Sequence, residues 1–365
     1  MNICDSRAIT MQADEFGFLY PQLTGTCAGC GKCDSICPVQ MGENGKPDCT
    51  EAYAAYAKDE TIRADSSSGG VFSLLALDVL ERGGAVYGAA FDERFAIKHI
   101  CVEKVSELSR LRGAKYAQSD VAECFREIRE GLERGQQILF SGTPCQAAGL
   151  HSFLGKEYDT LLLVDTVCHS VPSPAAWLQY VKYRADCDNG GALPKHINQR
   201  SKRSGWSRYA YSSLFEYENG TTYCASPSDD LYRKLFVGGY LSRESCASCR
   251  FKGLDRISDI TLGDFWGIWD ICPEFDDNKG TSLLLVHSEK GKKAIEALTS
   301  GAMKSTRVAL ESAYAENQAI IKPYKPSEKR DEALAACVAG DFGACQKILN
   351  PSKASLFRRI MRKIK

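Results

Sequence analysis

Short apolar runs alternate with amphipathic stretches through the middle of the chain. Apolar positions recur at helical spacing over residues 71–80, directly after the Ser-Ser-Ser-Gly-Gly stretch at 66–70, and predict a helix with a serine cap. An apolar run over 85–91 predicts the next strand. Two further runs, 138–140 and 161–164, predict buried strands, and each precedes a helix start. This order of strand, helix, strand and helix predicts a parallel sheet.

The second half of the chain continues with strands and helices. Residues 209–225 alternate between apolar and polar positions around an Asn-Gly pair, which is a hairpin signal. Residues 259–267 predict a strand that ends in a glycine-flanked aromatic turn, 282–287 predict another strand, and 291–299 predict a helix. The tail 356–365 is basic and amphipathic, so it is either a membrane-surface segment or a frayed chain end.

Residues 1–50 have a different character from the rest of the chain. They show little apolar periodicity and are rich in glycine and cysteine, so a metal cluster rather than a core would hold them together. We therefore expect an α/β protein in three parts. These are a ferredoxin-like segment over 1–50, a mixed, largely parallel α/β domain over 51–300, and a helical C-terminal extension with a basic tail over 301–365.

Charge and length exclude several classes of protein. The 365 residues carry 46 basic and 46 acidic side chains, so no net field draws the chain to nucleic acid or to an anionic membrane. No apolar run approaches the roughly 18 residues of a membrane helix, and the first residues lack a secretory signal. We expect a soluble, cytoplasmic protein with no transmembrane segment. Its 17 cysteines are too few for a disulfide scaffold, so clustered cysteines indicate metal ligands.

The cysteine pattern near the N-terminus is the most specific signal in the chain. Cys27, Cys30, Cys33 and Cys37 form a C-x2-C-x2-C-x3-C-P run, the ligand spacing of a bacterial-type [4Fe–4S] site. Glycines between the first three cysteines permit the backbone angles that such a tight loop needs. A zinc knuckle is the alternative, but zinc sites use two well-separated ligand pairs. The spacing therefore favours an iron–sulfur cluster.

Cys4 bears on which thiol completes this outer cluster. In duplicated ferredoxins the fourth cysteine of each run binds the other cluster. We therefore expect Cys4 to join Cys27, Cys30 and Cys33. Cys37 would then serve a second outer cluster, lost through a truncated or late-started N-terminus. The alternative is a one-cluster segment in which Cys37 folds back onto its own loop.

Four more cysteines lie where a second, inner cluster would need them. Cys145 and Cys168 each follow a predicted parallel strand, at the sheet edge where such folds bind ligands. Cys246 and Cys249 form a C-x2-C pair, which suits a cluster, a zinc ion or a redox disulfide. Four thiols complete the shell of a cubane. In an alternative hypothesis Cys145 is a nucleophile and His169 its base, as in thiol hydrolases.

Two segments carry features of anion sites. The helix start after residues 66–70 presents free N–H groups and a positive dipole end, which suit the pyrophosphate of a flavin, although an ordinary capped helix has the same pattern. Residues 195–208 contain five basic side chains next to Trp206 and Tyr209. This stretch is either a solvated loop or a site for a small anionic ligand, and nucleic acid is a remote third hypothesis.

Taken in order, the motifs resemble those of the coenzyme F420 hydrogenase/dehydrogenase beta subunit family, in its form with a ferredoxin-like N-terminus. The resemblance covers roughly residues 1–290 and depends on the order of several motifs. These are the cluster motif at Cys27, Ser67-Ser68-Gly69-Gly70, Gly113-Ala114-Lys115-Tyr116, Gly142-Thr143-Pro144-Cys145-Gln146, Cys168-His169, Cys246-x2-Cys249 and Gly263-Asp264-Phe265-Trp266-Gly267.

The resemblance implies an FAD-containing iron–sulfur oxidoreductase that passes electrons between ferredoxin-type clusters and a deazaflavin or another two-electron partner. Flavin suits this junction because it exchanges single electrons with clusters and pairs of electrons with organic substrates. The implied ligands of the inner [4Fe–4S] cluster are Cys145, Cys168, Cys246 and Cys249. The implied FAD-binding residues are Ser67, Ser68, Gly69, Gly70, Lys115, Tyr116 and Asp264.

The resemblance leaves the substrate open. Expected partners are ferredoxin or another redox protein, together with coenzyme F420 or another small oxidised metabolite. A non-catalytic electron-transfer subunit of a larger redox complex is the alternative, and a zinc-stabilised binding module is a third hypothesis. Two residues depart from the expected motifs. Ser170 stands where the family more often has Gly after Cys-His, and Asp5 stands where a ferredoxin motif has Pro.

Overall fold

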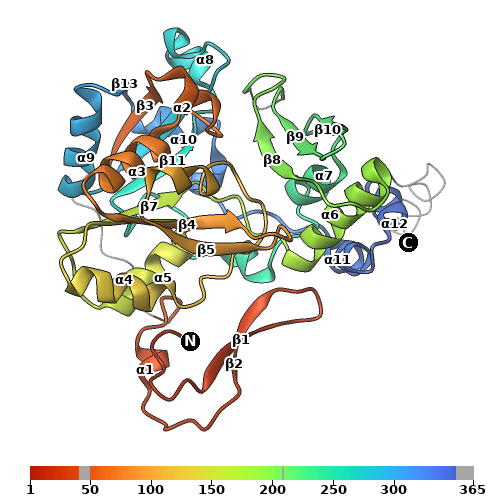
Figure 1. Cartoon of the computed structure of the whole chain (residues 1–365), viewed down its shortest axis with the longest axis horizontal. Helices are drawn as coiled ribbons and strands as arrows, with labels where there is room; N and C mark the ends of the chain where they lie inside the picture. The colour runs from red at the N-terminus through yellow and green to blue at the C-terminus, as the bar shows by residue number, and fades with distance from the viewer. Residues whose placement is uncertain (41–49, 208, 351–365) are drawn as a thin grey trace, which may run out of the picture.

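A mixed eight-stranded sheet forms the centre of the protein (Figure 1). The computed structural model describes residues 1–40, 50–207 and 209–350. In spatial order the strands of this sheet are β13 (Met303–Val308), β3 (Glu51–Ala57), β12 (Ser282–Val286), β11 (Ile260–Asp264), β7 (Leu161–Thr166), β6 (Ile138–Gly142), β4 (Ala85–Phe91) and β5 (Ile97–Val102).

The pairing directions explain where ligand-binding loops gather. Strands β11, β7, β6 and β4 run parallel to one another, whereas the pairings toward both edges are antiparallel. The parallel strands read as apolar runs because helices cover both of their faces. The predicted mixed α/β sheet is confirmed, with its parallel strands at the centre. Their carboxyl ends therefore form one edge at which loops meet.

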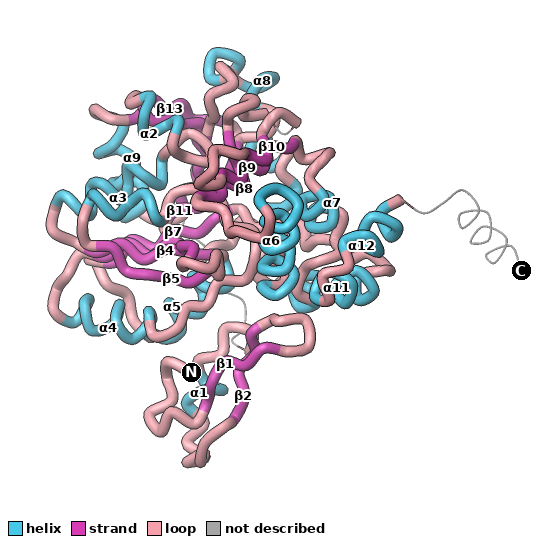
Figure 2. The backbone as a smooth tube through the Cα atoms, turned by 45° about the vertical axis from the view of Figure 1, so that its right-hand side comes forward, coloured by secondary structure: helices cyan, strands magenta, loops and turns pink. Residues whose placement is uncertain are grey.

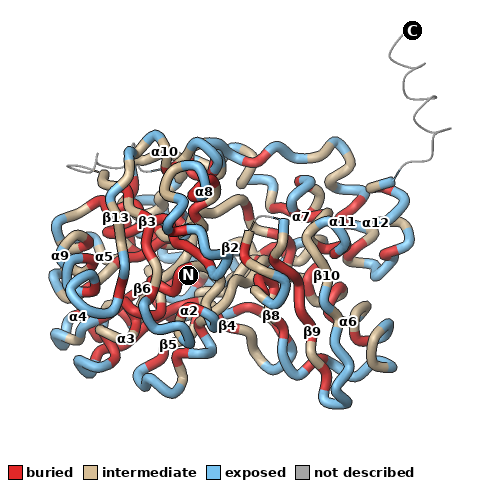
Figure 3. Tube along the Cα trace, turned by 90° about the horizontal axis from the view of Figure 1, so that it is seen from above, coloured by how far each residue is buried: buried red, intermediate tan, exposed pale blue. Residues whose placement is uncertain are grey.

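Helices cover both faces of the sheet. Helices α3 (Val71–Glu81) and α9 (Glu289–Thr299) pack on one face, and α4 (Cys124–Glu133) and α5 (Pro144–Leu154) pack on the other. In Figure 3 buried positions follow the strands, while exposed positions lie on outer helix turns and loops. Shorter elements in the connections are α2 (Glu60–Ala64), η1 (Val105–Arg110), α8 (Ile268–Ile271), η3 (Pro273–Phe275), α10 (Leu310–Ala315) and η4 (Gln318–Ile320).

A second group of helices and strands stands beside the large sheet (Figure 2). Its side chains form a separate, second hydrophobic core that includes Trp177. Its elements are α6 (Pro174–Asn189), α7 (Leu231–Val237), α11 (Arg330–Val338) and α12 (Phe342–Leu349), with a small antiparallel sheet of β8 (His196–Ser201), β9 (Ser212–Glu216) and β10 (Thr222–Ala225). The predicted hairpin at Asn219-Gly220 is confirmed by the pairing of β9 and β10. The solvated loop predicted over 195–208 is wrong for its first part, because β8 is a strand that buries Arg200.

The N-terminal segment lies against this second core. It contains the hairpin β1 (Ile9–Ala13) and β2 (Leu19–Leu23) and the short helix α1 (Lys32–Ser35). Phe18, directly before β2, is 0% exposed and packs among the residues of the second core. Arg243 Nη1 donates a hydrogen bond to the Leu19 carbonyl at 2.8 Å. These contacts fix the segment to the body of the protein.

The C-terminal part contributes to both cores. Strand β13 pairs with β3 and so extends the main sheet, while α11 and α12 pack on α6 and α7. The expected division at residues 50 and 300 stays a prediction, and the predicted basic tail lies outside the described residues. No helix within the described ranges is both long and apolar enough to cross a bilayer.

Candidate functional site

Four cysteine thiols gather beyond the carboxyl ends of two neighbouring parallel strands. Cys145 lies shortly after β6 and Cys168 shortly after β7. Because β6 and β7 pair in parallel, both thiols lie at the same edge of the sheet. Cys246 lies in the short helix η2 (Glu244–Ser248), and Cys249 directly follows it.

Backbone pairing brings η2 to Cys168. Two hydrogen bonds of 2.8 and 3.0 Å join residues 170–173 to residues 241–243. The hydroxyls of Ser170 and Ser242 lie 2.6 Å apart in the same pairing. Ser170, which stands where the family more often has glycine, therefore helps to join the two halves of the cysteine site.

The four thiols share one electrostatic environment. Burial raises the pKa of the Cys168 thiol, and the charges of Cys145, Cys246 and Cys249 raise it further. Burial also raises the pKa of Cys246 to about 11, with contributions from Cys145 and Cys249. Cys145 keeps exposed surface as a residue, while partial burial of its thiol raises its pKa. The structure thus brings the four predicted inner cysteines together.

The alternative pairing of Cys145 with His169 is not formed. Cys145 Sγ lies 3.1 Å from the Thr143 hydroxyl. His169 packs edge-on against Phe236 at 5.3 Å, and its Nε2 is buried without a hydrogen-bond partner among the described residues. Burial lowers the pKa of His169 to about 4, so the ring is neutral at pH 7. This arrangement lacks the contact between nucleophile and base that a thiol hydrolase needs.

Helix α3 begins at the predicted phosphate cradle but without a serine cap. Its N-cap is Gly70, which has a left-handed φ of 89°, and no side chain caps the helix. Ser68 Oγ donates instead to the Thr281 carbonyl at 3.0 Å, and the Gly69 N–H donates to Ser282 Oγ at 3.0 Å. The predicted serine cap is therefore wrong, because this loop is anchored to β12. The first N–H groups of α3 are left without a side-chain acceptor.

Lys115 and Tyr116 lie on the loop after η1. Lys115 Nζ donates to the carbonyls of Arg112 at 2.8 Å and Gly113 at 3.1 Å. Burial lowers the pKa of Lys115 to about 7. The Tyr116 N–H donates to Gln199 Oε1 at 2.5 Å, which ties this loop to β8. Lys115 is therefore a half-buried lysine held by carbonyl groups, and an anionic ligand would stabilise its charged form.

The Lys115 loop and the end of β8 both approach the start of α3. Arg112 Nε donates to Ser73 Oγ of α3 at 3.2 Å. Lys202, just after β8, donates to the carbonyl of Ser68, and Ser67 is half-buried in the same loop. Burial lowers the pKa of Lys202 to about 7. Two lysines and an uncapped helix start therefore lie in one region.

Asp264 at the end of β11 is already engaged by protein groups. It accepts a hydrogen bond from Trp206 Nε1 at 3.2 Å and lies 3.0 Å from Arg200 Nη2. The Trp206 ring stacks on Trp266 at 5.2 Å. Sequence reasoning placed Arg200 and Lys202 in a basic stretch but not at this site. Their spacing of two residues was a usable signal, because it puts side chains of an extended segment on the same face.

The outer cysteines lie on the loop that leads into α1. Cys27, Cys30 and Cys33 are exposed. Gly29 and Gly31 have left-handed φ angles of 66° and 69°, which confirms why glycines separate these cysteines.

Cys4 lies beside that loop. Its neighbour Asp5 pairs with Lys32 at 2.5 Å, which accounts for an acidic residue where ferredoxin motifs have proline. Burial lowers the pKa of the N-terminal amine, and the thiols of Cys4 and Cys33 both act on it, so both lie near this amine. Cys37 follows α1, and two residues later the Val39 carbonyl accepts a hydrogen bond from Arg250, next to Cys249.

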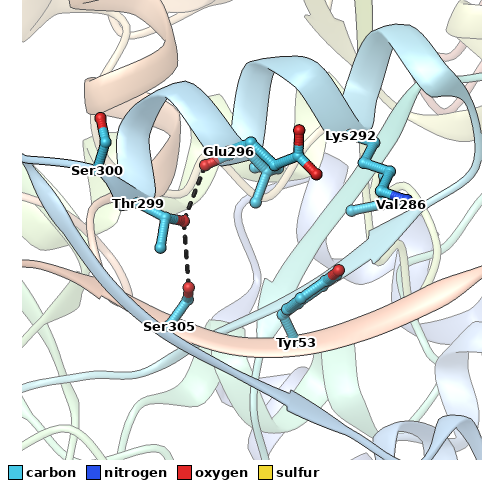
Figure 4. Close-up of a pocket in the computed structure, with 8 residues that line it drawn as sticks. Tyr53, Val286, Lys292, Glu296, Thr299, Ser300 and Ser305 are labelled. Atoms are coloured by element: carbon cyan, nitrogen blue, oxygen red, sulfur yellow. Dashed lines mark hydrogen bonds between the residues drawn. The ribbon is translucent and has the colours of Figure 1, made fainter.

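A pocket of about 320 Å³ lies between α9 and strands β3, β12 and β13 (Figure 4). Tyr53, Lys292 and Glu296 line it, and the Thr299 and Ser305 hydroxyls lie 3.2 Å apart at its end. None of the predicted site residues lines this pocket, so it is separate from the candidate redox site.

Comparison with known proteins gives the family. Two regions of the coenzyme F420 hydrogenase/dehydrogenase beta subunit match this chain, the N-terminal region over residues 52–126 and the C-terminal region over residues 135–310. The F subunit of the F(420)H(2) dehydrogenase of Methanosarcina mazei is 30% identical over 125 residues, which are 33% of this chain and 34% of that relative. The alignment thus spans about a third of the relative.

One solved structure, of the F420-reducing [NiFe] hydrogenase complex from Methanosarcina barkeri, contains a chain with a TM-score of 0.48 and 16% identity, covering 84% of this chain and 94% of that one. The family assignment depends on the two sequence matches, which follow each other in the family's order and together span most of the described chain. The chain therefore belongs to the coenzyme F420 hydrogenase/dehydrogenase beta subunit family, a family of redox-enzyme subunits.

Proposed function

We propose that this chain is an iron–sulfur flavoprotein oxidoreductase. It would pass electrons between ferredoxin-type [4Fe–4S] clusters and, through FAD, a two-electron partner. The observation that carries this proposal is the convergence of Cys145, Cys168, Cys246 and Cys249 at the carboxyl edge of the parallel strands. Family membership supports the redox role.

The proposed inner cluster uses these four thiols as its ligands. Within the described ranges no three His, Cys, Asp or Glu side chains are close enough to share a single metal ion. A zinc ion draws its four ligands around one point, whereas each thiolate of a [4Fe–4S] cluster is associated with its own iron. Four thiolates are the ligand shell that a [4Fe–4S] cluster needs, and membership of a family of redox-enzyme subunits supports the cluster over zinc. The chain would contribute four cysteine sulfurs, which bind iron as thiolates, and a half-buried setting, which tunes the potential of such a cluster.

The proposed FAD site uses Ser67, Ser68, Gly69, Gly70, Lys115, Tyr116 and Asp264. Bound FAD would supply the exchange between one-electron and two-electron carriers. The free N–H groups at the start of α3 would bind the pyrophosphate, and the charges of Lys115 and Lys202 would neutralise it. Asp264 would act indirectly, because its carboxylate already holds Trp206 and Arg200.

The proposed partners are a ferredoxin or another redox protein and a small molecule, either coenzyme F420 or another oxidised metabolite. A non-catalytic electron-transfer subunit is the second candidate, favoured by the exposed outer cysteine loop, which a partner protein could reach directly. Transfer of two electrons between a small molecule and the bound flavin, reduced beforehand for the forward direction, would favour the enzyme over this subunit role.

Anaerobic purification followed by spectroscopy tests the proposal. We expect absorption from both clusters and flavin, iron and sulfide in equal amounts, and FAD released on denaturation. A colourless protein that contains zinc and no flavin would contradict it. Iron without flavin would leave the electron-transfer subunit as the better description.

A further inference from the structure

Two guanidinium groups, those of Arg200 and Arg233, meet at the Tyr211 ring. The Arg200 guanidinium lies over the Tyr211 ring at 3.9 Å and over the Trp266 ring at 4.9 Å, and its side chain is 2% exposed. Arg233, on α7, donates through Nε to the Tyr211 hydroxyl at 2.5 Å and lies over the Tyr116 ring at 4.0 Å. The aromatic rings therefore hold two positive groups side by side.

Both guanidinium groups keep unused donors. Among the described residues, Arg200 Nε and Nη2 and Arg233 Nη1 are buried and have no hydrogen-bond partner. Asp264 lies 3.0 Å from Arg200 Nη2, but this ion pair lacks the geometry of a hydrogen bond. Buried N–H groups of a charged side chain are costly when they stay unpaired. The donors are therefore arranged for an acceptor that the described residues do not provide.

The charges around this pair are mostly positive. Lys115 and Lys202, in the same region, donate to backbone carbonyls in the described structure. Asp230, the carboxylate at the start of α7, accepts from the Tyr180 hydroxyl at 2.7 Å and from the Arg233 backbone N–H at 2.7 Å. Asp264 forms an ion pair with Arg200, while the charge of Asp230 interacts with Arg233 and that of Asp277 with Lys202, so cations outnumber carboxylates in this region.

One ordered water would not provide acceptors for all of these unpaired donors. A cavity of about 10 Å³ beside Arg233, lined also by Tyr116 and Gln199, has room for about one water molecule. That water could satisfy Arg233 Nη1, but Arg200 is not among the residues that line the cavity. Arg200 Nε would stay without an acceptor, and Arg200 Nη2 would keep only its ion pair with Asp264. A ligand with several acceptor oxygens fits the set of donors better.

We propose that Arg200 and Arg233 form a binding site for an oxyanion, namely a phosphate or carboxylate group of a small molecule. Planar guanidinium groups match such groups with paired N–H donors, and the stacked rings fix their orientation. The anion has two sources, the phosphates of FAD or an acidic group of the two-electron partner. This inference deepens the proposed function, yet the oxyanion site itself depends only on the chain's own geometry.

The test measures how inorganic phosphate and pyrophosphate change the melting temperature of the full-length protein. Flavin-loaded and flavin-depleted samples are titrated, with sodium chloride at matched ionic strength as the salt control. We expect a rise in melting temperature for the wild type and its loss in Arg233→Gln. Lys234→Gln, a neighbour on α7, is the matched control and should keep the response. Arg233→Lys retains the charge without the planar fork and should show a weaker response.

The flavin content of the variants shows whether the bound oxyanion belongs to FAD or to the two-electron partner. If Arg233→Gln loses FAD and only the flavin-depleted wild type responds to phosphate, the anion is a phosphate of FAD. If Arg233→Gln keeps FAD and the flavin-loaded wild type responds, the anion belongs to the two-electron partner. Equal responses in wild type and Arg233→Gln, or no response in either form of the wild type, would overturn the site. The phosphate response is measurable even if the protein binds no flavin, so the two proposals fail separately.

Discussion

The ammonium group of Lys252 donates hydrogen bonds to the backbone carbonyl of Cys168 and, at 2.7 Å, to that of Ala319. Burial raises the pKa of the Cys168 thiol, and Lys252 is the main influence that opposes this rise. The charges of Cys249 and Cys246 act on Lys252 in turn. Lys252 is therefore a cation that lies next to the ligands of the proposed inner cluster.

Removing this charge should lower the reduction potential of the inner cluster. Reduction adds a negative charge, which a nearby ammonium stabilises by about 2 kcal/mol at an effective dielectric constant of about 20, or on the order of 90 mV. Lys252→Gln should therefore shift the midpoint potential to more negative values, whereas Lys252→Arg should stay near wild type. A redox titration followed by electron paramagnetic resonance gives both values. If Lys252→Gln retained its iron and the midpoint potential of the inner cluster did not change, Lys252 would not tune that potential.

Replacing one inner cysteine should remove one cluster and leave the other. Cys168→Ala should lose about four irons per chain, because a cubane needs all four thiolates, while the outer cluster keeps its iron. Iron and sulfide analysis of anaerobic protein measures this. Cys187→Ala, an exposed cysteine of α6, is the matched control and should keep full iron. Equal iron in Cys168→Ala and wild type would show that Cys168 is not a ligand.

Charge at the start of α3 should decide flavin binding. Ser68→Asp places a carboxylate against the proposed pyrophosphate and should empty the flavin site. Ser68→Ala removes only the hydrogen bond to Thr281, worth about 1 kcal/mol, and should keep flavin. Flavin released per chain, measured by fluorescence after denaturation, distinguishes the two variants. Stoichiometric flavin in Ser68→Asp would place the pyrophosphate elsewhere.

Lys115 should give flavin binding a pH dependence. Burial lowers the pKa of Lys115 to about 7, so the free protein holds it partly uncharged near neutral pH. A bound phosphate favours the ammonium form and raises this pKa, so binding takes up a proton. By linkage, affinity for FAD should fall as the pH rises above about 7.

Dissociation constants of FAD at several pH values test this sign. Lys115→Met should bind FAD more weakly and lose the dependence, while Lys115→Arg should stay charged throughout and lose only the dependence. Affinity that rises with pH in the wild type would contradict the assignment.

The sequence was sufficient to predict the helices and strands that are marked by the pattern of apolar residues within their own segment. The apolar runs at 138–140 and 161–164 became β6 and β7, and their order along the chain placed Cys145 and Cys168 at one sheet edge. Periodic apolar positions after Gly70 likewise gave α3. In these segments each residue's own preference agrees with the tertiary structure, so pattern reasoning suffices.

Prediction failed where distant residues decide the outcome. The serine cap is absent because the loop is bound by Thr281 and Ser282, more than 200 positions away in the chain. Strand β8 was missed because Arg200 is buried by stacking on Tyr211 and Trp266, not by apolar character. Partners of this kind become visible only once the chain is folded.

Cys4, rather than Cys37, should complete the outer cluster. The ion pair between Asp5 and Lys32 holds the chain next to Cys4 against the cysteine loop, and the Cys4 and Cys33 thiols lie near the same amine. Arg126 fixes this position by donating to the Cys4 carbonyl at 2.9 Å. Cys37 instead lies at the far end of α1, where the following residues contact Arg250.

Iron analysis of two alanine variants separates the two ligand schemes. Cys4→Ala should lose about four irons and the signal of the outer cluster, whereas Cys37→Ala should keep both, because duplicated ferredoxins cross their fourth ligand to another cluster. Each variant keeps the inner cysteines, so the inner cluster is an internal standard in the same sample. Loss of the outer iron in Cys37→Ala, with iron retained in Cys4→Ala, would mean that the cysteine run folds back to bind its own cluster.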